Sequence, residues 1–313
     1  MKVKTKKLTK LNKIFILVIC VVLLLFVWTN LFDLKIDPNY KLLVTLGLAT
    51  PTPIPASELT VDLLSKSVVP DAGYSVNVNW GETGKKLVTA GGIDMAKFSQ
   101  NYSTAEYAEL LKYLTEAKDL GITINSKNAY FWVNTLWALG LTQKSDVLDK
   151  GVMGTEYRDR LANFASTAGW TLGSKDAVSL YSSAQIIPLT EEQQDMVTKV
   201  SANIYRPCCG NPTSFPDCNH GMAILGLIEL MVSQGFSEQQ IYRAALAFNS
   251  YWFSSTYVDL AYYFQTEKGL TWDEVDPKLV LSAEYSSAPG YQAIKKQIGS
   301  IPGSQNVGAS CGA

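Results

Sequence analysis

Apolar residues recur at helical spacing through most of the chain beyond residue 58. Where the pattern is amphipathic, it predicts a helix with one buried face. Such spacing occurs at 107–117, 128–140 and 155–169, and 222–232 is apolar nearly all round. We expect 222–232 to be a central core helix. Alternation typical of a strand is confined to 74–80. The pattern predicts a mainly α-helical domain over 58–298.

Three sequences of the capping-box type mark expected helix starts. In each, a serine or threonine is followed three positions later by Glu or Gln, so that two backbone N–H groups are satisfied reciprocally. The three boxes are Ser103-Thr-Ala-Glu106, Thr190-Glu-Glu-Gln193 and Ser237-Glu-Gln-Gln240. We expect the first helix to end at Gly121 and the second to continue to Ile204.

Aromatic residues crowd the stretch 248–264. They are either a ligand cleft, a surface that lies on a membrane, or a pair of core helices. We favour the core helices, because Asn249 and Asp259 recur at intervals that suit a polar outer face. Glu229 is the one acid within the apolar stretch 222–232, and we expect its side chain to point to solvent.

The N-terminus has the pattern of a membrane anchor. Residues 1–13 carry six lysines and no acid, and 14–32 is an almost unbroken apolar stretch of the length that spans a bilayer. No small-x-small cleavage site follows directly, so an uncleaved anchor is favoured over a signal peptide. The positive-inside rule then places the N-terminus in the cytoplasm and the following domain outside it. The predicted location is a single-pass protein of the cell membrane.

Two linker-like segments flank the predicted domain. Residues 33–57 include alternating prolines and form an expected semi-rigid spacer. Residues 299–313 are rich in Gly and Ser, which predicts a flexible tail. Without the six N-terminal lysines, the chain has 21 basic against 28 acidic residues. Since a nucleic-acid binder usually has a basic body, we expect no nucleic-acid partner.

The candidate chemistry is concentrated in residues 206–222. Three of the five cysteines and the only histidine lie there, as the pair Cys208–Cys209 followed by Cys218 and His220. Prolines and glycine around the cysteine pair predict a constrained loop. Cys218 directly precedes the core helix, where the helix dipole lowers the pKa of a thiol. Thiolates and imidazole are the side chains that bind soft metals.

Metal binding is the leading interpretation of this segment. Cys208, Cys209 and Cys218 would supply thiolates, His220 a neutral nitrogen and Met222 an optional axial sulfur. Thiolates with imidazole suit zinc, and thiolates with a thioether suit copper(I). The expected cofactor is therefore a copper or zinc ion, bound by a site that needs no catalytic turnover. The test in a structure is that sulfurs and an imidazole nitrogen converge on one centre.

Three alternatives remain open from the residues alone. Cys208, Cys209 and Cys218 also suit a membrane-tethered thiol–disulfide oxidoreductase. Outside the cytoplasm, these cysteines and Cys311 make an even count that two structural disulfides would use completely, which suits a non-enzymatic envelope protein that binds a partner protein. A Cys/His nucleophile is the fourth interpretation, although two positions in sequence do not by themselves bring thiol and imidazole into catalytic geometry.

The stretch 197–244 also resembles known proteins. It contains Ser-Ala-Asn-Ile-Tyr-Arg-Pro-Cys-Cys-Gly-Asn-Pro and then Ile-Glu-Leu-Met-Val-Ser-Gln-Gly-Phe-Ser-Glu-Gln-Gln-Ile-Tyr. This resembles the cysteine-loop helical unit of CcmH-type proteins of cytochrome c maturation, and it is similar to exported bacterial proteins named for a Pro-Cys-Tyr-Cys-Gly-Cys motif. The resemblance implies a helix, a cysteine loop, a second helix, a turn and a third helix, with Cys208 and Cys209 as a redox pair.

The chain departs from the CcmH pattern in several respects. That pattern separates its two cysteines by two residues, whereas Cys208 and Cys209 are adjacent. Cys218 and His220 have no place in it, and the predicted anchor is N-terminal. These departures favour metal handling over the reductase role that the resemblance implies.

Overall fold

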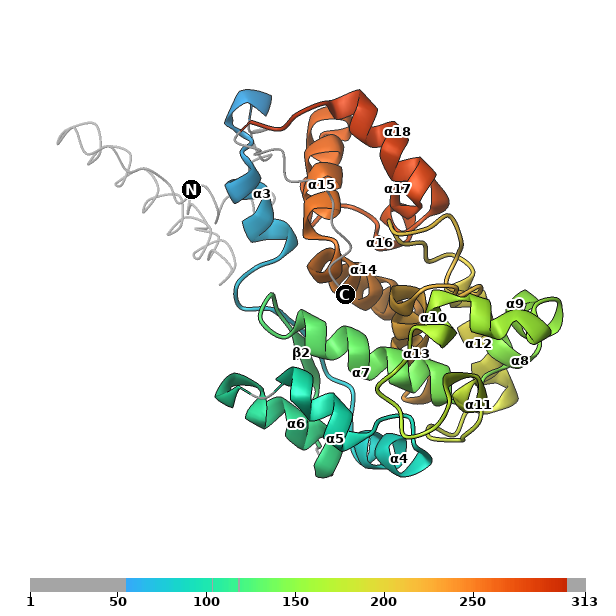
Figure 1. Cartoon of the computed structure of the whole chain (residues 1–313). Helices are drawn as coiled ribbons and strands as arrows, with labels where there is room; N and C mark the ends of the chain where they lie inside the picture. Colours follow the sequence, from blue (N-terminus) through green and yellow to red (C-terminus); the bar gives the residue numbers. More distant parts are fainter. Residues whose placement is uncertain (1–54, 103, 118, 303–313) are drawn as a thin grey trace, which may run out of the picture. The chain divides into compact units, whose positions relative to one another are not determined.

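Helices α7 (Ala129–Thr142) and α13 (Asn219–Ser233) lie side by side at the centre of the fold (Figure 1). Glycines allow their backbones to approach closely. A Cβ added to Gly140 would lie 2.1 Å from the carbonyl oxygen of Met222, and one added to Gly226 would lie 2.6 Å from that of Leu136. Nearly every side chain of both helices is buried, which confirms the predicted central core helix.

The computed structural model describes residues 55–102, 104–117 and 119–302. The predicted basic segment 1–13 and anchor 14–32 lie outside these residues, as do most of the proline spacer and most of the tail. Among the described helices, none has the length and apolar character needed to cross a bilayer. The predicted mainly α-helical domain is confirmed.

Within the residues that the structure describes, the elements follow one another as short and medium helices with a single two-stranded sheet. The remaining α-helices are α3 (Val61–Val68), α4 (Thr83–Ala90), α5 (Met95–Phe98), α6 (Ala108–Thr115), α8 (Asp146–Asp149), α9 (Val152–Thr155), α10 (Ala165–Ala168), α11 (Ala177–Leu180), α12 (Glu191–Ser201), α14 (Glu238–Trp252), α15 (Ser254–Lys268), α16 (Pro277–Val280), α17 (Ala283–Ser286) and α18 (Ala288–Ile298). The 3-10 helices are η1 (Ala56–Glu58), η2 (Ser99–Tyr102), η3 (Ala105–Tyr107) and η4 (Arg158–Asn163), and the strands are β1 (Tyr74–Val76) and β2 (Ile122–Ile124).

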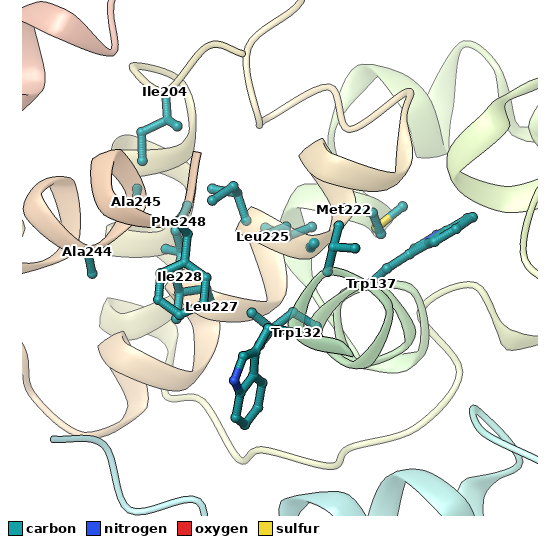
Figure 2. Close-up of a cluster of buried hydrophobic side chains, with 14 of the residues drawn as sticks. Trp132, Trp137, Ile204, Met222, Leu225, Leu227, Ile228, Ala244, Ala245 and Phe248 are labelled. Carbon is teal, nitrogen blue, oxygen red and sulfur yellow. The ribbon is translucent and has the colours of Figure 1, made fainter. Parts of the chain in front are cut away.

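The strands form a short antiparallel pair in which Tyr74 lies opposite Ile124. β1 covers only the first part of the predicted stretch 74–80. The indole of Trp132 on α7 donates to the carbonyl of Thr123 in β2, which fixes the pair against the central helix. The aromatic ring of Trp132 lies in the hydrophobic core that α7, α13 and α14 share. Figure 2 shows this core, including Trp132, Trp137, Met222, Leu225, Leu227, Ile228 and Phe248.

Two of the three predicted capping boxes are confirmed. Thr190 and Ser237 each cap their helix with the reciprocal bond from the Gln three residues later, at the starts of α12 and α14. α12 ends at Ser201, shortly before the predicted Ile204. Ser103 lies outside the described residues, and α6 begins later, at Ala108, after the turn η3.

The prediction of one helix over 155–169 is wrong. The chain there forms η4 and then α10, because Phe164 between them has extended backbone (ψ 135°). This conformation brings the ring of Phe164 against Tyr157 and Phe215, with ring centroids 5.7 and 5.5 Å away. Phe215 belongs to the loop 202–218, which carries the three cysteines and is called the cysteine loop below. The broken helix therefore packs against that loop instead of continuing past it.

The aromatic stretch 248–264 forms α14 and α15, and most of its rings are buried, as expected for core helices. The expected polar outer face is wrong, because Asn249 and Asp259 are both buried. Asp259 accepts hydrogen bonds from the hydroxyl of Tyr291 (2.7 Å) and the ammonium of Lys295 (2.8 Å), which join α15 to α18. These polar residues hold helices together rather than facing water.

Glu229 is also buried, against the prediction that it points to solvent. It lies on α13 with neither carboxyl oxygen hydrogen-bonded among the described residues. Burial raises its pKa well above the ordinary value of 4.5, and the nearby hydroxyl of Ser145 opposes this only in part. The packing of α13 against α7 thus encloses a carboxyl group, and its burial favours the protonated form.

Replacing Glu229 tests this buried acid. Above pH 4.5 the unfolded chain ionises while the folded state keeps the proton, so the free energy of unfolding falls as pH rises towards the raised pKa. Glu229→Gln cannot ionise and should remove that fall, by up to about 1.4 kcal/mol for each pH unit. Urea unfolding between pH 4 and 8 measures it. Exposed Glu191→Gln is the control, and equal slopes for wild type and Glu229→Gln would contradict the assignment.

Replacing Gly140 tests the close contact of α7 with α13. Gly140→Ala forces a Cβ into the backbone of Met222, and we expect a loss of about 1–3 kcal/mol in the free energy of unfolding. Gly210→Ala is the matched control, because the nearest atom to an added Cβ there is 4.0 Å away. Its effect should stay within about 0.5 kcal/mol. Equal effects of the two substitutions would show that the helices can separate without cost.

Candidate functional site

The cysteine loop runs from the end of α12 to the start of α13 and is fixed by backbone hydrogen bonds at several points. The amide of Thr213 donates to the carbonyl of Ile204 (2.8 Å), which closes the loop on itself. The amide of Tyr205 donates to Leu281 (2.8 Å), and the carbonyl of Cys209 accepts from the amide of Ala288 (2.8 Å). The loop is thereby tied to the C-terminal helices.

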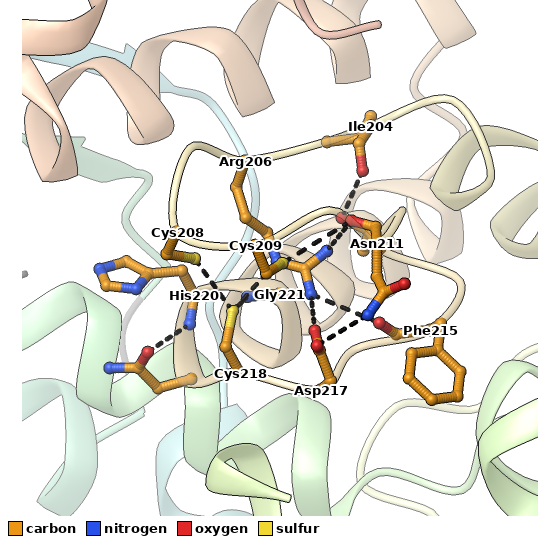
Figure 3. Close-up of polar contacts among 12 residues, drawn as sticks. Ile204, Arg206, Cys208, Cys209, Asn211, Phe215, Asp217, Cys218, His220 and Gly221 are labelled. Atoms are coloured by element: carbon orange, nitrogen blue, oxygen red, sulfur yellow. Dashed lines mark hydrogen bonds and ion pairs between the residues drawn. The ribbon is translucent and has the colours of Figure 1, made fainter. Parts of the chain in front are cut away.

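Arg206 lies beneath the loop with its side chain fully buried (Figure 3). Its guanidinium donates to the Sγ of Cys218 from Nε (3.1 Å) and to the carbonyl of Asn211 from Nη1 (2.8 Å). Nη2 donates to the carboxylate of Asp217 (2.5 Å) and the carbonyl of Phe215 (3.3 Å). A buried cation of this kind needs such a set of acceptors, because its desolvation is costly.

Gly221 makes room for that guanidinium. It lies in the first turn of α13, and an added Cβ would be 2.4 Å from Cζ of Arg206 and 2.5 Å from Nη2. The amide of Gly221 also donates to the Sγ of Cys218, which caps the helix (3.4 Å). The sulfur of Cys218 therefore accepts from both a cation and a helix N-terminus.

The three predicted cysteines are brought together. The Sγ atoms of Cys208, Cys209 and Cys218 all lie within 4.8 Å of one another, and all three are partly buried. Cys208 and Cys218 are in contact, with their sulfurs 3.2 Å apart. All three thiols are free. Three sulfurs at this spacing can hold one metal ion.

The environment divides these thiols into one acidic and two weakly acidic groups. Hydrogen bonds from Cys208 and then Cys209 hold the pKa of Cys218 well below its usual 9.0, and the Arg206 charge and His220 add to this, while burial opposes it. The hydrogen bonds to Cys209 and Cys218, with burial, raise the pKa of Cys208. The arrangement therefore favours the thiolate form at Cys218 over that of the other two cysteines.

His220 lies at the edge of this group, in the first turn of α13. Its ring packs against Phe253 and Trp252, with centroids 4.4 and 5.6 Å away. It is almost fully buried, and its Nδ1 has no hydrogen-bond partner among the described residues. It is not one of the donors that lie within 4.8 Å of one another, although it contributes to the low pKa of Cys218.

The other predicted sulfurs lie elsewhere. Met222 is fully buried and belongs to the hydrophobic core beside α7 (Figure 2). Cys311, which the two-disulfide interpretation requires, lies outside the described residues.

At the C-terminal end, Ile301 is buried and the carbonyl of Pro302 accepts from the amide of Val61, so packed structure continues past residue 298.

The cysteines could be identified from the sequence, but the residues that pack beneath them could not. The sequence places Arg206 close to the cysteines but does not show that Asp217, Asn211 and Gly221 surround its side chain. The signal that was present is the sequence Pro-Asp-Cys-Asn-His-Gly directly before an apolar helix. A buried arginine under the start of a helix needs a carboxylate to pair with and a small residue beside it. Asp217 and Gly221 meet these two needs.

Comparison with protein-family models, with curated proteins and with solved structures finds no match for this chain. The frame implied by the CcmH resemblance is present as α12, the cysteine loop, α13, a turn and α14. The resemblance itself stays an expectation from the sequence.

Removing Arg206 tests the origin of the Cys218 thiolate. Arg206→Gln takes away the cation that donates to its sulfur, so the pKa of Cys218 should rise. The pH dependence of iodoacetamide alkylation at Cys218, located by peptide mass mapping, measures it. Gly221→Ala, which displaces the guanidinium, should act in the same direction if Arg206→Gln does not fold.

Exposed Arg243→Gln on α14 is the control for this measurement. It removes the same charge without touching the cysteine loop, so its alkylation profile should match wild type. An unchanged profile in both Arg206→Gln and Gly221→Ala would show that the arginine does not set the ionisation of Cys218.

Proposed function

We propose that the cysteine loop binds a thiophilic metal ion, copper(I) or zinc(II), through Cys208, Cys209 and Cys218. The observation that carries this proposal is the convergence of the three sulfurs within 4.8 Å of one another. Two thiolates on one tetrahedral zinc ion lie about 3.8 Å apart. The closest sulfur pair here is at 3.2 Å, so small shifts would seat an ion among the three.

The surroundings of the sulfurs support a thiolate-rich metal site. A metal ion displaces the protons of Cys208 and Cys209 and binds the resulting thiolates. Arg206 and the amide of Gly221 donate to Cys218, as outer hydrogen bonds do to ligands of metal sites. No carboxylate joins the group of converging donors among the described residues, which favours soft metals over magnesium or calcium.

The number of ligands separates copper from zinc. Three sulfurs suffice for copper(I), whereas a structural zinc site has four ligands. His220 is the fourth donor that we propose for zinc, because it is buried beside the sulfurs and its Nδ1 is unpartnered among the described residues. We leave Met222 out of the proposed ligand set, since its side chain is part of the core.

Holding a metal or passing it to a partner would require no turnover. We propose, with the sequence prediction of an anchor at 14–32, that the domain is tethered to the membrane and meets an envelope protein partner outside the cytoplasm. In that setting the site would receive or deliver its ion at the partly buried cysteines of the loop.

Metal titration tests this function. Under anaerobic reducing conditions the purified protein should bind one ion per chain, measured for copper(I) against bathocuproine disulfonate and for zinc against pyridylazoresorcinol. Cys218→Ser and Cys208→Ser should each weaken binding by more than about 100-fold. His220→Asn should weaken zinc binding and leave copper(I) binding near wild type.

Met231→Leu, a buried methionine at the other end of α13, is the control and should leave both affinities unchanged. X-ray absorption of the loaded protein would count the sulfur neighbours directly. Metal binding that survives both cysteine substitutions would place the ion elsewhere and overturn the proposal.

A further inference from the structure

Cys208 and Cys218 are much closer than two thiols need to be to share a metal ion. Their sulfurs are 3.2 Å apart, so formation of a bond of about 2.05 Å requires an approach of only about 1.2 Å. Cys208 lies within the segment that the bonds between Thr213 and Ile204 close, and Cys218 is held against this segment by the guanidinium of Arg206. The backbone therefore needs little rearrangement to accept a disulfide between them.

The alternative pair in the cluster is less suitable. Cys208 and Cys209 are adjacent and the peptide bond between them is trans, which sets their Cα atoms about 3.8 Å apart. Disulfides usually join Cα atoms about 4.4–6.8 Å apart, so a bond between neighbours is strained. Cys209 instead directs its thiol towards the carbonyl of Asn211, at 3.9 Å. Of the two pairs that involve Cys218, the one with Cys208 has its sulfurs in direct contact at 3.2 Å, so Cys208 with Cys218 is the pair most readily oxidised.

We propose that a reversible disulfide between Cys208 and Cys218 gates the metal site: the reduced loop binds the ion, and oxidation releases it. The inference rests on the proposed function, since it uses the same sulfurs as ligands. Two of the three thiolate ligands are consumed by the disulfide. This leaves Cys209 for copper(I), or Cys209 with His220 for zinc, and these are too few donors to retain the ion. The ion leaves with its oxidation state unchanged.

The oxidant that we name is a disulfide, either of a small thiol or of a partner protein. The Sγ of Cys218 attacks one of its sulfurs, the external S–S bond breaks and one thiolate leaves. Cys208, after loss of its proton to solvent, then attacks the Sγ of Cys218, and the second external thiolate leaves. Two electrons thereby pass from the cysteine pair to the external disulfide, and a dithiol reverses both steps.

The geometry around Cys218 suits the first of these steps. Arg206 and the amide of Gly221 both donate to its sulfur, which stabilises negative charge there and orients it. All three cysteine residues are only partly buried, which leaves the loop open to an external disulfide.

The experiment equilibrates the purified protein, with and without metal, in mixtures of oxidised and reduced glutathione. Disulfides are located by mass mapping and bound metal is measured in the same samples. Wild type and Cys209→Ser should both form the bond between Cys208 and Cys218, whereas Cys208→Ser should form no bond within the loop. Metal release should follow disulfide formation with the same midpoint, and a dithiol should restore binding.

The outcomes distinguish this inference from the function on which it rests. A reduced protein that binds no metal shows that the proposed function is wrong, and the proposed redox gate is then wrong as well. A disulfide between Cys208 and Cys218 that leaves the metal bound overturns the gate alone. Oxidation that yields only a bond between Cys208 and Cys209, or only glutathione adducts, also overturns it.

Discussion

The ion pair of Arg206 with Asp217, buried beneath the cysteine loop, is the interaction on which the site depends. A guanidinium without its acceptors would be a large unfavourable charge in the interior, and losing one partner of such a pair costs about 3–5 kcal/mol. The loop must therefore follow a path that presents the carbonyls of Asn211 and Phe215 to the cation. That path is what brings the cysteines together.

Helix α13 connects the site to the core. Its first turn holds the sulfur of Cys218 and the glycine that admits the arginine, while its middle is pressed against α7 through Gly226. One rigid helix carries both features about two turns apart, so the packing of α13 against α7 sets the position of the sulfur. Glu229 lies further along the same helix, where burial raises the pKa of its carboxyl group.

The helical class, the core helix and two capping boxes followed from the sequence, because local spacing and local hydrogen bonds determine them. The break in the helix at Phe164 did not follow from the sequence, because it depends on packing of the Phe164 ring against Phe215, which lies far along the chain. Likewise, Asp259 and Glu229 were predicted to be exposed from periodicity alone. Burial of a polar group depends on tertiary partners, such as Tyr291, that a single sequence does not reveal.

For the site, clustering of the cysteines was predictable from their spacing and from the start of the core helix. The acceptors of Arg206 were not, because they are mostly backbone carbonyls, which every residue possesses. Met222 lies one turn from Cys218, which made it a candidate ligand. In the structure, however, Met222 lies on the face of α13 that packs against α7 and the hydrophobic core.

The loop depends on residues that come long after it in the chain. Tyr205 donates to Leu281, and Cys209 accepts from Ala288, so both anchors lie in the last part of the described domain. A growing polypeptide carries all three cysteines well before these anchors have been synthesised. We therefore expect the thiols to remain unorganised during synthesis and to meet only when the C-terminal helices dock, so that an incomplete chain carries the cysteines without the assembled site.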